Sequence, residues 1–483
     1  MRHQRAAIEQ FQKAASDAED SWRTSKSLFN EARGLYKLEE FDKTIVTATK
    51  AMQSSHLLRA EKIEMLELIQ YANHDLGCHD DALEASRNAM DVANDPRTTY
   101  DMIRACHFAS SFDRTCSLVS SLVTDSDLEK GGAVLSVMME DWPWVIEYIS
   151  FACAQRGQLQ LAHDAFKLAA RYSAECLIGV FRSSGEAIAE AALGQLHFRH
   201  YKDDKKATQI WENVTKCYPG TLGAARAACA LAPLYLLKAE GRAFGDAEPW
   251  LGKLEGLVAQ LGPEGNMSMD SIRPTDEISA LIGRWYTHQN DAKLARAKVL
   301  PLLKLAIEEL RDTDVHNDHD AYTALGRALL CLGDHANAEI AYAFAMPLQK
   351  SRELIELEAK EKGGGAEAQD DAASPEEDTG ILAPFLLNAD CDGRCSRREA
   401  DFRSFSFCEV CIDIGFCDEC LAKVKNGRLS FRICDSTHPF MEAYPPRGLI
   451  RKIPGGHMIR TSDGQEVSFE DWLGNVSKKW LRL

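Results

Sequence analysis

The sequence lacks any long hydrophobic run. Within its 483 residues no stretch approaches the roughly 18 apolar residues that cross a bilayer. The longest candidate, AACALAPLYLL at 227–237, is short and contains Pro233, and the first residues, MRHQRAAIEQ, lack the apolar core of a signal peptide. We therefore expect a soluble cytoplasmic protein, with the nucleus as the alternative compartment. In such a reducing environment, clustered cysteines are more often metal ligands than disulfides.

Positive charge is also scarce. The chain has 56 Lys and Arg residues against 73 Asp and Glu residues, a net charge of -17. Because nucleic acids and anionic membranes are themselves negative, we expect neither to be a partner of the whole chain. Proline occupies only 15 positions and hydrophobic residues make up 45%, which is typical of a folded protein.

The usual catalytic motifs are missing as well. The sequence has no GxxxxGK[ST] phosphate loop, no GxSxG elbow, no HExxH helix and no GxGxxG turn after a strand. Its scattered histidines, among them His74, His107, His197 and His457, have no acidic or thiol partner at a spacing that would define a site. We therefore expect that the protein is not an enzyme.

What the sequence does contain is a helical pattern that runs almost unbroken from about 22 to 350, with apolar residues three and four positions apart. The clearest unit is ALGRALLCLGDHANAEIAYAFAM at 324–346. Its small residues Gly326, Ala338 and Ala345 stand where two helices approach closely, and Gly333 falls in the turn between them. This pattern resembles the tetratricopeptide repeat, a helix-turn-helix unit of about 34 residues.

Weaker copies of the same unit occur earlier in the chain. They place Phe41, Gly77 and Gly157 in turns, and the last of them ends at Pro219. The resemblance implies an α-solenoid over 22–360, preceded by a helix or tail at 1–21, whose concave surface takes a peptide or a partner helix. The alternative is an irregular helical bundle. The four copies cover 32–52, 69–90, 151–172 and 198–219.

The composition changes abruptly at 363, where GGGAEAQDDAASPEEDTG has six acidic residues and no basic ones. Such a segment has too little apolar surface to offset the entropy of ordering its backbone. We predict an acidic flexible linker over 361–385.

Seven of the fifteen cysteines lie within 44 residues after this linker. They form pairs separated by two or three residues, and the last pair is completed by a histidine, the spacing that lets two side chains bind one tetrahedral ion. Eight ligands of this kind predict two structural zinc ions in a domain at 386–446, a size at which metal binding supplies folding free energy. The predicted ligands are Cys391, Cys395, Cys408, Cys411, Cys417, Cys420, Cys434 and His438.

This arrangement resembles the ZZ-type zinc finger, whose first and third pairs share one ion and whose second and fourth pairs share the other. Carried over, one zinc is bound by Cys391, Cys395, Cys417 and Cys420, and the second by Cys408, Cys411, Cys434 and His438. The opening CDG motif and Phe416 also match the family, whereas the x3 spacing of the first pair and Cys434 in place of a histidine depart from it. A RING finger has a histidine in the middle of its ligand series, and a MYND finger ends His-x3-Cys, so both fit less well.

Many ZZ fingers bind the ammonium group of a protein N-terminus or a histone tail through carboxylates. The matching positions are Asp392 and Asp413, but Gly415 replaces an acid that many of these fingers carry. Asp392 and Asp413 are therefore candidate peptide-binding residues. The alternative is that they hydrogen-bond backbone amides or lie in solvent.

The last segment, 447–483, predicts a short hairpin and a helix that begins near Ser468. Five apolar residues fall on one face of that helix. We expect this face to pack on the finger or on the solenoid, with a free partner-binding helix as the alternative. The five residues are Phe469, Trp472, Leu473, Val476 and Trp480.

The predicted fold class is therefore all-α: a tetratricopeptide-like α-solenoid followed by a small, zinc-stabilised, ZZ-like finger with short strands. The combination resembles the C-terminal half of fungal NACHT-type signalling proteins. That resemblance implies an intracellular protein-interaction scaffold or adaptor with protein or peptide partners, in which two tethered modules bind one partner with avidity. The alternative is a ubiquitin-ligase or ubiquitin-binding subunit that uses its zinc finger.

Overall fold

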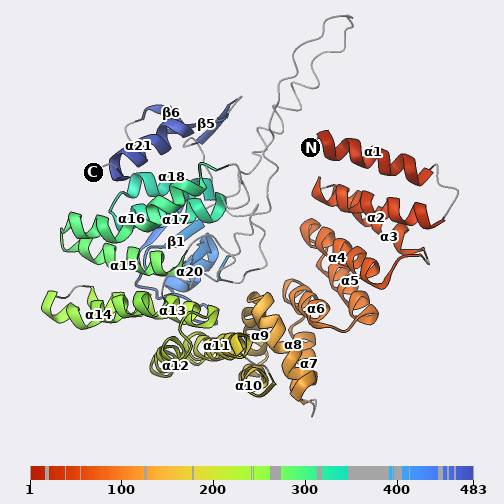
Figure 1. Cartoon of the computed structure of the whole chain (residues 1–483), viewed down its shortest axis with the longest axis horizontal. Helices are drawn as coiled ribbons and strands as arrows, with labels where there is room; N and C mark the ends of the chain where they lie inside the picture. The colour runs from red at the N-terminus through yellow and green to blue at the C-terminus, as the bar shows by residue number, and fades with distance from the viewer. Residues whose placement is uncertain are drawn as a thin grey trace, which may run out of the picture. The chain divides into compact units, whose positions relative to one another are not determined.

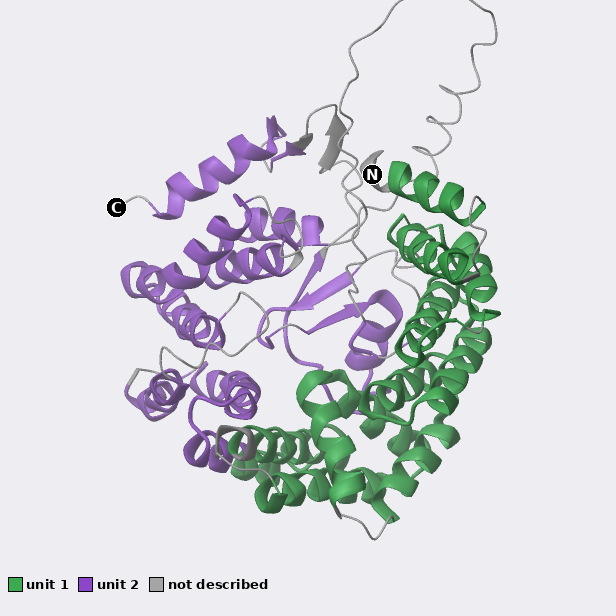
Figure 2. Ribbon diagram, turned by 45° about the vertical axis from the view of Figure 1, so that its right-hand side comes forward, with its two compact units in different colours: residues 1–210 green, residues 211–483 purple. Residues whose placement is uncertain are grey.

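The predicted helical array is present in the computed structural model. The chain divides into two compact units, residues 1–210 and residues 211–483 (Figure 2). The structure describes residues 2–481 apart from 17–20, 39, 55, 125–127, 177–178, 241, 243, 262–272, 313–317, 346–390, 394, 396–404, 413, 444–449, 454–455 and 462–463. The predicted linker at 361–385 and Asp413 therefore lie outside the described residues.

The first unit is built from consecutive helices, each packed mainly on its neighbours in the sequence (Figure 1). This is the arrangement of a helical solenoid. Its helices are α1 (Arg2–Ser16), α2 (Ser21–Lys37), α3 (Phe41–Met52), α4 (Arg59–Leu76), α5 (His79–Val92), α6 (Pro96–Phe108), α7 (Phe112–Thr124), α8 (Leu128–Asp141), α9 (Trp144–Gln155), α10 (Leu159–Cys176) and α11 (Gly179–Leu196), which continues into a π-helical segment (His197–Tyr201).

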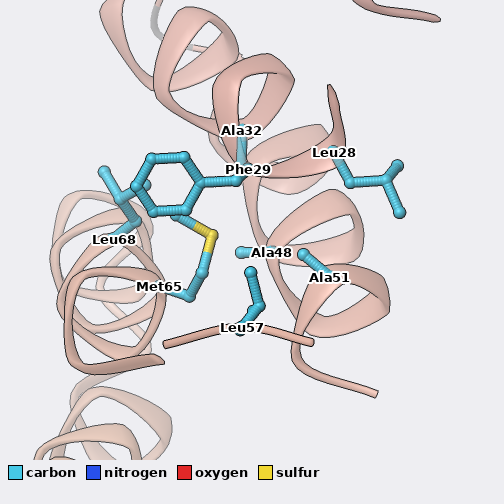
Figure 3. Packing of buried hydrophobic residues seen from close by; sticks show 8 residues of the cluster. All are labelled: Leu28, Phe29, Ala32, Ala48, Ala51, Leu57, Met65 and Leu68. Atoms are coloured by element: carbon cyan, nitrogen blue, oxygen red, sulfur yellow. The ribbon is translucent and has the colours of Figure 1, made fainter. Parts of the chain in front are cut away.

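Alternating small and large side chains explain how these helices pack. Ala48 and Ala51 of α3 are completely buried and let the helix backbones approach closely. Phe29 of α2 and Met65 of α4 fill the space between them, as Figure 3 shows. Each fully buried large side chain contributes about 1.5–3 kcal/mol, so this contact is among those that order the start of the solenoid.

Glycines end several helices at the predicted turns. Gly77, Gly157 and Gly333 have φ values of +76°, +67° and +72°, a conformation that residues with a Cβ rarely adopt. The prediction for Phe41 is wrong, because Phe41 is the first residue of α3 rather than a turn residue. Leu38 and Glu40, which precede α3, instead donate to carbonyls at the end of α2.

The second unit is also built from consecutive helices. They are α12 (Asp204–Cys217), which begins just before the boundary, α13 (Leu222–Ala239), α14 (Phe244–Leu261), α15 (Pro274–His288), α16 (Ala292–Glu309), α17 (Asp318–Cys331) and α18 (His335–Ala345). In the predicted unit at 324–346, a Cβ at Gly326 would lie 2.8 Å from the Tyr342 ring. Close approach of α17 and α18 therefore requires glycine there.

By length and hydropathy, α13 is long and apolar enough to cross a membrane, although no single run within it reaches 18 apolar residues. Of this helix, 61% is buried within the protein, which is how a core helix of this array packs.

The cysteine-rich segment forms a small antiparallel sheet with one helix. Strand β1 (Phe405–Cys408) lies between β2 (Gly415–Cys417) and β3 (Phe440–Ala443), and α20 (Asp418–Lys425) follows β2 directly. We call residues 391–443 the finger. In the register of β1 and β2, Phe405 pairs with Cys417 and Phe407 with Gly415.

The chain ends in a second small sheet and a helix. Strands β4 (Ile450–Ile453), β5 (Gly456–Arg460) and β6 (Glu466–Ser468) are antiparallel, and α21 (Phe469–Leu481) begins one residue after the predicted start. The predicted hairpin is therefore present, with β6 added as a third strand.

Candidate metal centre

Four cysteines from three parts of the finger form the first cluster, which we call cluster 1. Cys391 and Cys395 precede the sheet, Cys417 ends β2, and Cys420 lies in the first turn of α20. Their sulfur atoms all lie within 4.8 Å of one another. Gly393 is required at this point, because a Cβ there would lie 2.4 Å from the Cys420 Sγ.

Three cysteines and one histidine form the second cluster, which we call cluster 2. Cys408 ends β1, Cys411 follows in the next turn, and Cys434 and His438 come from the segment before β3. The Cys434 Sγ lies 3.5 Å from the Cys408 Sγ and 3.8 Å from the Cys411 Sγ. The His438 Nδ1 lies 3.3–3.4 Å from all three sulfur atoms, so Nδ1 is the nitrogen that faces the centre of the cluster.

These distances match a tetrahedral zinc site. Zn–S bonds of about 2.3 Å at tetrahedral angles place two sulfur atoms about 3.8 Å apart, and a Zn–N bond of about 2.1 Å places the nitrogen about 3.6 Å from each sulfur. The observed separations lie within about 0.3 Å of these values, and thiolate with imidazole is a donor set that zinc accepts. Both clusters could therefore hold zinc.

Contacts within cluster 2 also favour a thiolate, the form that binds metal. Burial raises the pKa of the Cys408 thiol, but hydrogen bonds from Cys411, Cys434 and His438 outweigh this and hold that pKa far below its usual value. The same hydrogen bonding to Cys408 raises the pKa of Cys411. These contacts therefore favour the thiolate of Cys408 over that of Cys411.

The two clusters are interleaved along the chain. Their ligand pairs alternate, so that the first and third pairs belong to cluster 1 and the second and fourth to cluster 2, as the resemblance to ZZ fingers implies. The structure thus brings together the four predicted residues of each set. That they bind metal stays a prediction.

Of the two candidate peptide-binding acids, the structure describes Asp392 alone. The Asp392 carboxylate accepts a hydrogen bond from the Gly415 amide at 2.8 Å, and the Asp392 amide donates to the Gly415 carbonyl at 3.0 Å. Asp392 therefore joins the first ligand pair to β2, which is the alternative considered for it. Asp413 lies outside the described residues.

Packing explains why residue 415 is glycine. A Cβ at this position would lie 2.1 Å from Cε1 of Phe405, a side chain that is 2% exposed. The phenyl ring occupies the space that an acidic side chain at 415 would need. An ammonium pocket with a second carboxylate at 415 is therefore sterically excluded.

The finger packs directly on helices of the second unit (Figure 1). The Arg284 guanidinium of α15 donates to the Glu409 carbonyl at 2.7 Å and lies 3.6 Å from its carboxylate. Tyr342 of α18 stacks on Phe407 with ring centroids 4.3 Å apart and planes 17° apart. The finger is thus built onto the helical array, whereas the linker in the sequence suggested a separately tethered module.

Helix α21 also packs on this array, as its apolar face predicted. Trp472 is buried and donates to Asn337 at 2.9 Å, and Lys479 and Trp480 both donate to the Asp334 carboxylate at 2.8 Å. Burial would raise the pKa of Asp334, but these hydrogen bonds and one from Asn337 hold it below its usual value. Asp334 therefore links the turn between α17 and α18 to the end of the chain.

No sequence pattern predicted which helix residues contact the finger and α21. Arg284, Tyr342 and Asp334 stand in the repeats as single polar or aromatic residues, at no distinctive spacing. The sequence also showed no sign of a cluster of polar side chains in the first unit. There Tyr71 donates to Asp101 at 3.1 Å, and Arg97 pairs with Glu67.

No protein-family model matches this chain, and no curated protein matches it. Its function must therefore be inferred from the geometry and chemistry of the described residues.

Proposed function

We propose that this protein is an intracellular interaction scaffold or adaptor in which a tetratricopeptide-like solenoid carries a zinc-binding, ZZ-like finger. The observation that carries the proposal is the pair of interleaved four-ligand clusters at tetrahedral spacing. Such closed ligand sets are typical of structural zinc, which leaves no position for a reacting water. Zinc bound there would stabilise the fold of the finger.

The eight ligands of clusters 1 and 2 would bind the two ions, and the finger would then act as part of the solenoid surface. Support for this comes from Arg284 and Tyr342, which fix β1 against α15 and α18. A partner protein would contact the helices and the finger together, as one preformed surface. The likeness to fungal NACHT-type signalling proteins also implies a protein partner.

The finger is poorly suited to recognition of N-terminal amines. The Asp392 carboxylate already accepts the Gly415 amide, and Phe405 fills the position of a second acid. An ammonium group needs several such acceptors. Structural support of a binding surface is therefore the better role for the finger.

The experiment is an affinity capture with point variants, analysed by quantitative mass spectrometry. A chain truncated near 360 is a poor control, because it would expose Tyr342 and the surface covered by α21. Cys417→Ser, which disables one metal cluster, is compared with Cys78→Ser, a change at an exposed cysteine outside both clusters. We expect Cys78→Ser to retain the partners of the wild-type protein and Cys417→Ser to lose a defined subset. Identical partners for all three proteins, with zinc lost from Cys417→Ser, would show that the finger does not contribute to binding.

A ubiquitin-discharge assay tests the alternative. The purified protein is mixed with ubiquitin-loaded conjugating enzymes, with and without a zinc chelator. The scaffold proposal predicts no acceleration of discharge. Robust, zinc-dependent discharge would replace it with a ubiquitin-ligase function.

A further inference from the structure

The contacts between the finger and the helices gather around cluster 2. Phe407 immediately precedes its ligand Cys408, and Glu409 immediately follows it. Strand β3, which contacts α18, begins two residues after the ligand His438. Cluster 2 therefore lies directly behind the segment that touches the solenoid.

Cluster 1 is held together by contacts inside the finger. The Cys417 amide donates to the Cys391 Sγ at 3.3 Å, and the Cys395 Sγ lies 3.6 Å from the Cys417 Sγ. Asp392, between the first two ligands, bonds to the backbone of Gly415 in β2. The two clusters therefore differ in what they fix: cluster 1 joins the start of the finger to β2, and cluster 2 holds the segment that faces the helices.

The covered helix surface has a specific chemistry. The Arg284 side chain is 7% exposed, and its Nε donates to the Glu240 carboxylate at 3.1 Å, which orients the guanidinium. Its Nη1 donates to the Glu409 carbonyl at 2.7 Å and lies 3.6 Å from the Glu409 carboxylate, while the Tyr342 ring lies against Phe407. Phe407 lies in β1 and Glu409 in the bend directly after it, so this surface meets the end of a strand and the residue that follows it. The surface thus fits an extended segment with an aromatic residue followed, two positions later, by an acidic one.

Cluster 2 fixes the segment that fills this surface. The amides of Val410 and Cys411 donate to the Cys408 Sγ at 3.4 and 3.2 Å, and the Glu409 amide donates to the Pro439 carbonyl at 3.0 Å. These bonds set the direction of the Glu409 carbonyl that Arg284 binds. Loss of metal from cluster 2 would release the turn, whereas loss from cluster 1 would leave these bonds in place.

We propose that α15 and α18 form a peptide-binding surface, centred on Arg284 and Tyr342, that the metal-bound cluster 2 keeps closed with the chain's own segment 405–409. The partner it fits is an extended peptide with an aromatic residue two positions before an acidic one. This control of the surface rests on the proposed zinc binding. Because the covering segment is attached, its effective concentration is of the order of millimolar, so a free peptide at micromolar concentration binds only after release. By linkage, contact with Arg284 also strengthens metal binding in cluster 2.

The test uses the full chain and a fluorescein-labelled peptide with the sequence of residues 403–410, in which serine replaces the cysteine to prevent metal binding. Fluorescence anisotropy is measured with three proteins. They are the zinc-loaded wild type, Cys408→Ser/Cys434→Ser for cluster 2, and Cys391→Ser/Cys420→Ser for cluster 1. We expect saturable binding only to the cluster 2 variant. When Arg284→Met is added to the cluster 2 variant, peptide binding should weaken at least about tenfold, since the acidic residue of the peptide then loses its cationic partner.

Phe407→Ala provides a second route that leaves all eight ligands intact. We expect this variant to keep two zinc ions and to bind the peptide more tightly than the wild type, because the covering segment is weakened. Hydrogen exchange of α2–α4 serves as the control that the solenoid remains folded. A peptide with alanine in place of the aromatic and acidic residues should not bind to any variant.

Two results would overturn the inference. One is equal peptide binding by all proteins, including the wild type. The other concerns hydrogen exchange in the cluster 2 variant. The inference fails if segment 405–409 still covers α15 and α18 in that variant, and it fails equally if these helices are uncovered but do not bind the peptide. Neither result would affect the proposed zinc binding, which fails separately if the wild-type protein contains no metal.

Discussion

Adding one methyl group at Gly415 should destabilise the finger. In Gly415→Ala the new Cβ would lie 2.1 Å from Cε1 of Phe405, whereas carbon atoms pack at about 3.5–4.0 Å. The Phe405 ring would have to move by more than about 1 Å, although it is 2% exposed and packs edge-on against Phe407, with ring centroids 5.1 Å apart. The change therefore affects both β1 and β2, which carry ligands of both clusters.

Overpacking of this kind costs about 1–3 kcal/mol. A cost of about 2 kcal/mol would raise the population of molecules with an unfolded finger roughly 30-fold, since each 1.4 kcal/mol is a factor of ten. Gly415→Asp, which introduces the acid that many ZZ fingers carry, should cost more because its carboxylate would be buried beside an aromatic ring. Phe405→Ala combined with Gly415→Asp should recover part of that loss by making room.

The measurement is the rate of zinc transfer to a chromogenic chelator, together with thermal unfolding. Gly474→Ala in α21 is the matched control, because a Cβ at that position meets no atom within 4 Å. We expect its zinc release to equal that of the wild type. If Gly415→Ala also releases zinc at the wild-type rate, the steric role assigned to residue 415 is wrong.

Two further predictions concern the helices. Trp472→Ala should lower the free energy of unfolding of the second unit by about 3–5 kcal/mol, because a 1% exposed indole that donates to Asn337 is removed. Denaturant titration measures this free energy. A loss below about 1 kcal/mol would mean that α21 does not pack on the helices. In the first unit, burial and then repulsion from Asp101 raise the pKa of Glu67 to about 7, above its usual 4.5. The folded state therefore binds more protons than the unfolded state between these values, and its stability falls as pH rises from about 4.5 to 7. We expect the melting temperature of this unit to be about 5–10 °C lower at pH 8 than at pH 5, and Glu67→Gln to remove its share of that dependence. An unchanged pH dependence in this variant would contradict the assignment.

The helical array could be predicted from the sequence because its signals are local. Gly77, Gly157 and Gly333 mark turns by their need for positive φ, and Ala48 or Gly326 mark close helix contacts. Phe41 was misplaced because an aromatic residue fits equally well in a turn or at a helix start. Its actual position depends on the hydrogen bonds that close the preceding helix.

The finger was predictable for a different reason, since paired ligands at short spacing carry their own geometry. The docking of the finger was not predictable. It depends on Arg284 and Glu409, which are 125 positions apart in the sequence, and on the single stacked pair of Tyr342 and Phe407. The steric reason for Gly415 was not predictable either, because the Phe405 ring reaches Gly415 across the β1–β2 pair, in which Gly415 is paired with Phe407.

The interleaving of the two metal sites is tested most directly by the zinc content of two double variants. Cys391→Ser/Cys420→Ser changes two ligands of cluster 1, whereas Cys391→Ser/Cys408→Ser changes one ligand of each cluster. Native mass spectrometry should find two zinc ions in the wild-type protein, one in the first variant and none in the second. If the sites instead followed one another along the chain, the first variant would contain none and the second would contain one.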